Sequence, residues 1–109
     1  MLNEEILEQL RFLGEDDPEF VRDMIRGFLD EAAESVYTLG ELAPEALERL
    51  CHKLQGAGAN VGAKALPELF QQIRADLKTR PESVPELLGR VPSLFEQTKK
   101  ALLAFAETL

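Results

Sequence analysis

The chain has 109 residues, of which 45% are hydrophobic and 6% aromatic, and it contains no tryptophan. This length fits one domain over residues 1–109 with a single core, and the hydrophobic fraction argues against a disordered chain. Twenty acidic residues against 12 basic ones give a formal net charge of −8, which opposes binding to nucleic acids and to anionic membrane surfaces.

Two helices are expected in the first 40 residues. Asn3 is followed by two acidic residues and is a suitable cap for a short helix that Gly14 would end. Asp17-Pro18-Glu19 begins a longer helix, because it combines a cap, a first-position proline and an acid. The apolar stripe of this second helix continues to Gly40 and consists of Val21, Met24, Ile25, Phe28, Ala32, Val36 and Leu39.

The third expected helix carries His52, the only histidine of the chain. It begins at Pro44, after a link over residues 41–43 that is short enough to make it an antiparallel neighbour of the preceding helix. It is expected to end within residues 60–62. One amphipathic stripe contains Leu47, Leu50, Cys51, Leu54, Gly58 and Val61.

Two more helices complete the expected fold. Apolar residues over 66–77 predict a fourth helix, with Pro67 tolerated in its first turn, that stops before Pro81. Ser83-Val84-Pro85-Glu86 has the pattern of a capping box for a last helix, and an apolar stripe continues from there to Leu109. Pro92 should kink or split this helix. No segment alternates like a strand. The sequence therefore predicts an all-α fold, an antiparallel up-and-down four-helix bundle with a short extra N-terminal helix.

His52 does not lie on the apolar stripe of its helix. At about 100° per residue it projects roughly 140–150° from the centre of that stripe, so it should stand in water. Each glycine inside a helix costs about 1 kcal/mol relative to alanine. Gly58 lies on the core stripe and would permit close approach of another helix. Gly56 faces outward one turn after His52, so we interpret it as leaving room for a phosphoryl group or a protein surface to reach the imidazole.

The segment from His52 to Gly62 resembles the histidine-containing phosphotransfer (Hpt) domain, whose pattern is roughly His-x-Leu-Lys-Gly followed by a glycine six residues later. The matching residues are His52, Leu54, Gly56 and Gly62, followed by Leu66, Leu69 and Ile73 at helical spacing. The acidic helix opening at residues 16–20 is also similar to members of that family, so the resemblance covers nearly the whole chain.

This resemblance implies a function in a two-component phosphorelay. His52 would accept a phosphoryl group from the aspartyl phosphate of a response-regulator receiver domain and pass it to another receiver. The partners would be receiver domains, including those of hybrid sensor histidine kinases. The receiver would supply Mg²⁺, and this chain would bind no cofactor of its own.

The sequence departs from the family pattern at two positions. Gln55 stands where the family usually has lysine, and Arg74 stands on the next helix where members often carry a neutral amide. Our hypothesis is that the positive charge has moved to the neighbouring helix, where Arg74 acts near the phosphohistidine. Arg49, one turn before His52, and Lys53, displaced sideways, are the other candidates to contact the phosphoryl group.

Other functions find less support in the sequence. Cys51 and His52 lie about 100° apart on a helix, and without a second histidine they do not suggest a metal site. No glycine-rich phosphate loop is present, so no ATP-dependent kinase activity of the chain's own is expected. The phosphocarrier role is what the family resemblance implies. The rival hypothesis is a non-enzymatic helical adaptor in which His52 is incidental.

The sequence also suggests where the protein works. Cys51 is the only cysteine and cannot form an internal disulfide. No signal peptide or long apolar run is visible, so we expect a monomer in the cytoplasm, without a membrane partner.

Overall fold

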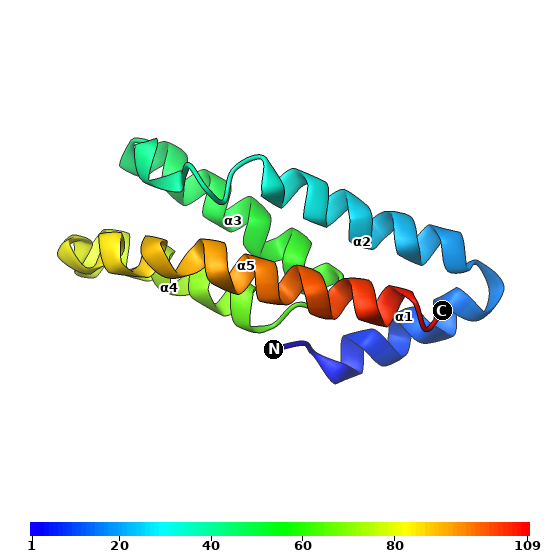
Figure 1. Cartoon of the computed structure of the whole chain (residues 1–109). Coiled ribbons are helices and arrows are strands. Elements are labelled where there is room, and N and C mark those ends of the chain that lie inside the picture. The colour runs from blue at the N-terminus through cyan, green and yellow to red at the C-terminus, as the bar shows by residue number, and fades with distance from the viewer.

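The computed structural model describes all 109 residues and contains five α-helices, two short 3-10 turns and no strands, which confirms the all-helical prediction (Figure 1). The helices are α1 (Glu4–Asp16), α2 (Pro18–Ala33), α3 (Pro44–Asn60), α4 (Ala65–Thr79) and α5 (Val84–Ala106), and the 3-10 turns are η1 (Leu39–Glu41) and η2 (Pro81–Ser83). None of the helices is both long enough and apolar enough to cross a membrane.

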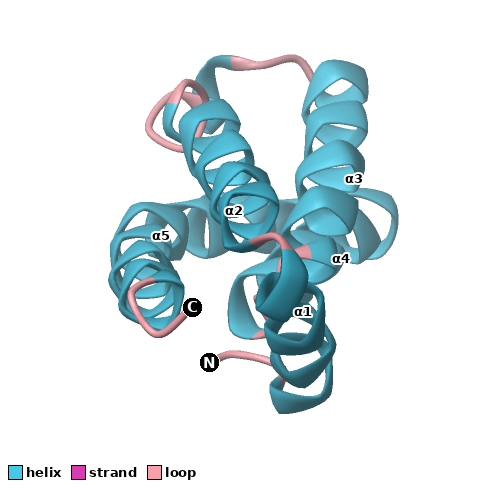
Figure 2. Cartoon of the chain, turned by 90° about the vertical axis from the view of Figure 1, so that its right-hand side faces the viewer, coloured by secondary structure: helices cyan, strands magenta, loops and turns pink.

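The four longer helices lie around a common core. α3 packs on α2 and on α4, and α5 also packs on both α2 and α4, so that each of these four helices has two neighbours among the other three (Figure 2). α1 packs against α2 at the end of the molecule where α5 finishes (Figure 1). The molecule is elongated, with principal extents of 46 × 23 × 20 Å.

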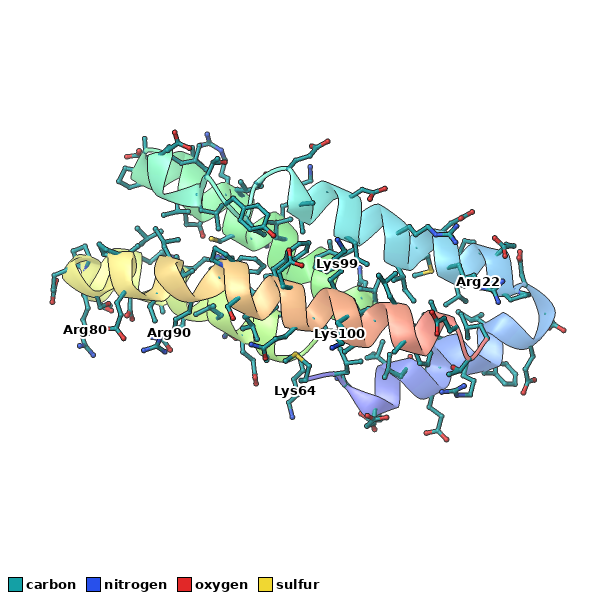
Figure 3. All side chains as sticks on the ribbon, viewed as in Figure 1. Arg22, Lys64, Arg80, Arg90, Lys99 and Lys100 are labelled. Carbon is teal, nitrogen blue, oxygen red and sulfur yellow. The ribbon has the colours of Figure 1, made fainter.

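A single hydrophobic cluster of 23 buried residues fills the space between the helices. Its largest members, with less than 2% of their surface exposed, are Phe70, Phe95, Ile25, Leu54, Leu66, Ile73 and Leu102. Charged side chains remain outside this cluster, and Figure 3 shows Lys64, Arg80 and Arg90 pointing away from the core. The apolar stripes read from the sequence therefore identify the buried faces of the helices.

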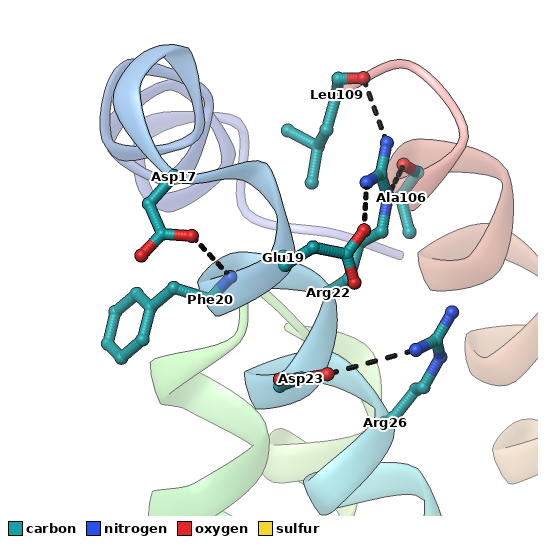
Figure 4. Close-up of polar contacts among 8 residues, drawn as sticks. All are labelled: Asp17, Glu19, Phe20, Arg22, Asp23, Arg26, Ala106 and Leu109. Atoms are coloured by element: carbon teal, nitrogen blue, oxygen red, sulfur yellow. Dashed lines mark hydrogen bonds and ion pairs between the residues drawn. The ribbon is translucent and has the colours of Figure 1, made fainter.

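The N-terminal caps of the first two helices are as predicted. The side chain of Asn3 accepts a hydrogen bond from the Ile6 amide at 3.2 Å, and Asp17 accepts one from the Phe20 amide at 3.1 Å (Figure 4). The predicted end of the first helix at Gly14 is wrong, because α1 continues to Asp16. Gly14 is a buried packing residue: a Cβ built on it would lie 3.0 Å from a methyl group of Leu109.

The second helix is shorter than predicted, since α2 ends at Ala33 and turns follow over residues 34–38. Val36 and Leu39 are nevertheless buried, so the apolar stripe continues although the helix does not. Tyr37 lies in these turns, where its hydroxyl donates to Glu96 of α5 and its ring meets Phe95 edge-on, with 6.3 Å between the ring centroids. These contacts of Tyr37 with α5 stabilise the turns over residues 34–38 relative to a continued helix.

The predicted cap of α5 is wrong, and so is one of the two alternatives predicted for Pro92, a split of the helix. Ser83 precedes the helix but makes no capping hydrogen bond, because its hydroxyl is turned toward two other acceptors, the Asp76 carboxylate and, at 2.8 Å, the Arg80 carbonyl, which share its one proton. Pro92 does not split the helix, which runs without interruption from Val84 to Ala106. The buried neighbours Val91 and Phe95 hold both sides of Pro92 against the core, and this packing offsets the missing backbone donor.

The connection between α3 and α4 is held by the N-terminal segment. Gly62 has a φ of +92°, and a Cβ built there would lie 2.6 Å from a methyl group of Leu7, so this turn requires glycine. The Asn3 amide donates to the Gly62 carbonyl at 2.7 Å. The Met1 carbonyl accepts from the amides of residues 64 and 65 at 3.0 and 3.2 Å, and thereby caps α4, which has no side-chain cap.

Asp76 is the one buried carboxylate, and it connects α4 with the turn before α5. Hydrogen bonds from the Ser83 hydroxyl and then from Gln72, the latter at 2.7 Å, hold the pKa of Asp76 below its ordinary value in spite of burial. Because the pKa is lower in the folded than in the unfolded chain, ionised Asp76 stabilises the fold above a pH of about 3.9, and this contribution is lost as the pH falls through the folded pKa.

We therefore expect the free energy of unfolding to fall between pH 6 and pH 3, and to fall less in Asp76→Asn and in Ser83→Ala. Urea unfolding of the three proteins at both pH values measures this difference. An equal loss of stability in wild type and Asp76→Asn would contradict the assignment. Glu86→Gln, which changes an exposed carboxylate, is the matched control.

Candidate functional site

The face of α3 that meets solvent is set by the face that is buried. Leu47, Cys51, Leu54 and Gly58 are buried. Successive residues of a helix are about 100° apart, so this burial turns the opposite stripe outward. His52 and Gly56 are exposed on that stripe, as the helical period predicts.

The two glycines of α3 have different surroundings. A Cβ built on Gly56 would meet no atom within 4 Å, so the backbone one turn after His52 faces open space. A Cβ built on Gly58 would lie 3.2 Å from the ring of Phe28 on α2 and 3.2 Å from Pro67 on α4. Gly58 therefore permits the close approach of two neighbouring helices, and Gly56 leaves the surface beside His52 uncovered.

Arg74 of α4 lies across the flank of α3 that carries His52. Its Nε donates to Oε1 of Glu48 at 2.9 Å, and its Nη1 donates to Oε1 of Gln55 at 2.8 Å. Glu48 is one turn before His52 and Gln55 is about one turn after it, and all three share one side of the helix. The guanidinium group is thus held alongside the part of α3 that carries His52, and its role toward a phosphoryl group stays a prediction.

Glu48 was not among the residues singled out from the sequence. Its side chain is half-buried, and the hydrogen bond from Arg74 is the main cause that lowers its pKa, with smaller contributions from the charges of Arg74, Lys78 and His52. The spacing of four residues between Glu48 and His52 was a signal available in the sequence, because residues at this spacing are neighbours on a helix surface. What the sequence does not contain is the contact of Glu48 with Arg74 across two helices.

The other two cations near His52 lie on the side away from α4. Lys53 is exposed, and its Nζ is 3.6 Å from Oε1 of Glu31 on α2. Arg49 is exposed and makes no ion pair within the chain. His52 therefore has a paired arginine on one flank and an unpaired arginine about one turn before it on the other.

Cys51 is adjacent to His52 in the chain but belongs to the core. It is fully buried, and burial raises the pKa of its thiol to about 11, so the reactive thiolate is scarce at neutral pH. No three His, Cys, Asp or Glu side chains converge in a group that could hold a metal ion. The exposed nucleophile of this face is the imidazole of His52.

A comparison with protein families finds one match. The family model of the Hpt domain matches residues 23–103, a span that contains the whole of α3 and α4 and most of α2 and α5. No curated protein and no solved structure matches the chain.

The surroundings of the two glycines predict opposite responses to alanine. Gly56→Ala should raise the free energy of unfolding by about 1 kcal/mol, because alanine favours the helix and its methyl group meets nothing. Gly58→Ala, the matched control on the same helix, should be clearly less stable than Gly56→Ala, because its methyl group displaces Phe28 or Pro67. Urea unfolding measures both variants. A Gly56→Ala protein less stable than wild type would show that this position is not open.

Proposed function

Because the chain belongs to the Hpt domain family, we propose that it is a histidine phosphotransfer module that carries a phosphoryl group on His52 between receiver domains. The family membership implies histidine phosphotransfer in phosphorelays in general. The proposal adds that His52 is the residue that carries the phosphoryl group. It also takes the ring of α2 to α5 as the antiparallel up-and-down four-helix bundle expected from the sequence.

The observation that carries the proposal is the placement of His52. It is the only histidine, it is exposed on α3, and open space lies over Gly56 one turn away. A second protein can therefore approach the imidazole without moving any side chain at position 56. Attack by the imidazole needs an unhindered nitrogen, and this face supplies one.

The proposed reaction exchanges one phosphoryl bond for another. A neutral imidazole nitrogen of His52 attacks the phosphorus of an aspartyl phosphate on the receiver, a P–N bond forms, and the P–O bond to the aspartate breaks. The aspartate leaves as a carboxylate, and the imidazole loses its N–H proton to solvent. Transfer to the next receiver reverses these steps. Mg²⁺ and the acidic pocket that position the phosphoryl group belong to the receiver.

The proposal also includes the binding partners, the oligomeric state and the place of action of the chain. Receiver domains, free or within a hybrid sensor histidine kinase, are the proteins that this face would bind. The chain acts as a monomeric phosphocarrier in the cytoplasm and uses no ATP or metal of its own. The rival function is a helical adaptor in which the same fold binds a partner and His52 is incidental, and only phosphorylation of the chain separates the two.

The test of this function is labelling by a phosphorylated receiver. Wild type should take up label in a form that is stable to base and labile to acid, as an N-phosphohistidine is. His52→Gln should take up none. Its melting temperature should stay close to that of wild type, because substitutions at exposed positions usually change stability by no more than about 0.5 kcal/mol.

Cys51→Ser and Ser35→Ala serve as controls for acceptance at another nucleophile, and both should label like wild type. Retained labelling in His52→Gln would exclude His52 as the acceptor. Failure of wild type to label with several receivers would favour the adaptor.

Gln55 and Arg74 determine which cation lies near the negative charge of a phosphoryl group on His52. Gln55 occupies the place of the usual lysine in the Hpt pattern, and it accepts a hydrogen bond of 2.8 Å from Arg74. We propose that the cation has moved from α3 to α4, with Arg74 doing in part what lysine at position 55 would do. The gain is small, because a solvent-exposed ion pair contributes about 0–1 kcal/mol and salt weakens it.

Arg74→Ala should lower the phosphorylated fraction at equilibrium with a receiver severalfold at low salt, and adding Gln55→Lys should restore much of it. Arg90→Ala, which removes an arginine from a pair on α5, is the control and should have no effect. The measurement is the distribution of label between the two proteins at several salt concentrations. An unchanged distribution in Arg74→Ala would leave Arg49 or Lys53 as the cation.

A further inference from the structure

Glu48 and Arg74 form an ion pair immediately beside the proposed phosphoacceptor. The two atoms Nε of Arg74 and Oε1 of Glu48 are 2.9 Å apart, and the side chains are 24% and 29% exposed. Partial burial of both groups makes this pair less screened than the surface pairs of α2 and α5, in each of which the carboxylate side chain is at least 66% exposed. In the unphosphorylated protein, the positive charge of Arg74 is therefore neutralised by Glu48.

A phosphoryl group on His52 would change this balance. It adds about two negative charges, and it would lie roughly 6 Å along the helix axis from Glu48, which is four residues away at about 1.5 Å per residue. Arg74 uses two of its five N–H donors, one on Glu48 and one on Gln55. The guanidinium can thus approach a third acceptor, but its charge is shared with the carboxylate already bound to it.

We propose that Glu48 sets the phosphorylation equilibrium of His52 by competing with the phosphoryl group for Arg74. The carboxylate pairs with Arg74 in the resting protein and repels the phosphoryl group in the modified one. The pairing lowers the free energy of the unphosphorylated state and the repulsion raises that of the phosphorylated state. Both shift the equilibrium away from phosphorylation, so Glu48 makes the phosphohistidine a better donor. Glu48 is a positioning residue that acts through Arg74. The inference rests on the proposed function, since it concerns the same histidine.

Glu45 provides a natural comparison on the same helix. It is exposed, it has no cationic partner, and it lies seven residues before His52, roughly 10 Å along the axis. This distance is about one Debye length at physiological ionic strength, so its charge is largely screened from a group on His52. Loss of a charge at position 45 therefore reproduces the change in net charge without the contact to Arg74.

The test uses phosphoramidate, a small chemical donor, so that no receiver is needed. The imidazole nitrogen attacks the phosphorus, the P–N bond to the amine breaks, and ammonium leaves with the imidazole proton. Intact-mass measurement at a fixed ratio of phosphoramidate to ammonium gives the ratio of phosphorylated to unphosphorylated protein. Glu48→Gln keeps an oxygen acceptor for Arg74 and removes only the charge.

We expect Glu48→Gln to raise that ratio roughly twofold to fourfold at physiological ionic strength, and less at high salt. Glu45→Gln should leave it unchanged. In an Arg74→Ala background the gain from Glu48→Gln should shrink, because no guanidinium remains to be released. Melting curves of each variant establish that it is folded.

An unchanged or lower ratio in Glu48→Gln, or an equal gain with and without Arg74, would overturn the proposal. Absence of any phosphorylation of His52 by phosphoramidate would also overturn it. Failure of the proposed function is a separate result: normal phosphorylation by phosphoramidate together with no transfer from any receiver would refute the relay function and leave the role of Glu48 in place.

Discussion

Burial of one stripe of α3 is the constraint on which the arrangement of the site depends. A helix is rigid over its length, so placing Cys51, Leu54 and Gly58 in the core fixes the direction of every other side chain on it. His52 is directed into solvent for that reason, and it needs no interaction of its own to stay there. The packing of the buried stripe thus keeps the imidazole of His52 exposed.

The packing of α4 against α3 also fixes where the charge of Arg74 lies. Gly58 lets Pro67 approach α3 closely, and the turn at Gly62, closed by Leu7 and the N-terminal segment, sets the start of α4. These contacts bring Arg74, two turns further along, against the flank of α3. The contacts at Gly58 and Gly62 therefore help to place the positive charge of Arg74 on the flank of α3 that carries His52.

Much of this arrangement could be predicted from the sequence, because helical periodicity identifies buried and exposed faces. It placed His52 and Gly56 outward and Gly58 inward, and the structure agrees. Local signals failed where tertiary contacts compete with them. Gly14 packs against Leu109 and does not end a helix, Ser83 bonds to Asp76 and does not cap one, and the chain leaves α2 after Ala33. The Glu48–Arg74 pair was missed because periodicity on one helix says nothing about which side chain of another helix reaches it.

The proposal that this chain passes a phosphoryl group on is tested by following the label from this chain to a receiver. Radiolabelled phosphoprotein, freed of its donor, is mixed with an unphosphorylated receiver domain and Mg²⁺, and both proteins are followed with time. The account predicts that label leaves this chain and appears on the receiver in a form that is labile to base, as an aspartyl phosphate is. Label that stays on this chain, or that is released only as inorganic phosphate while the receiver remains unlabelled, would contradict it.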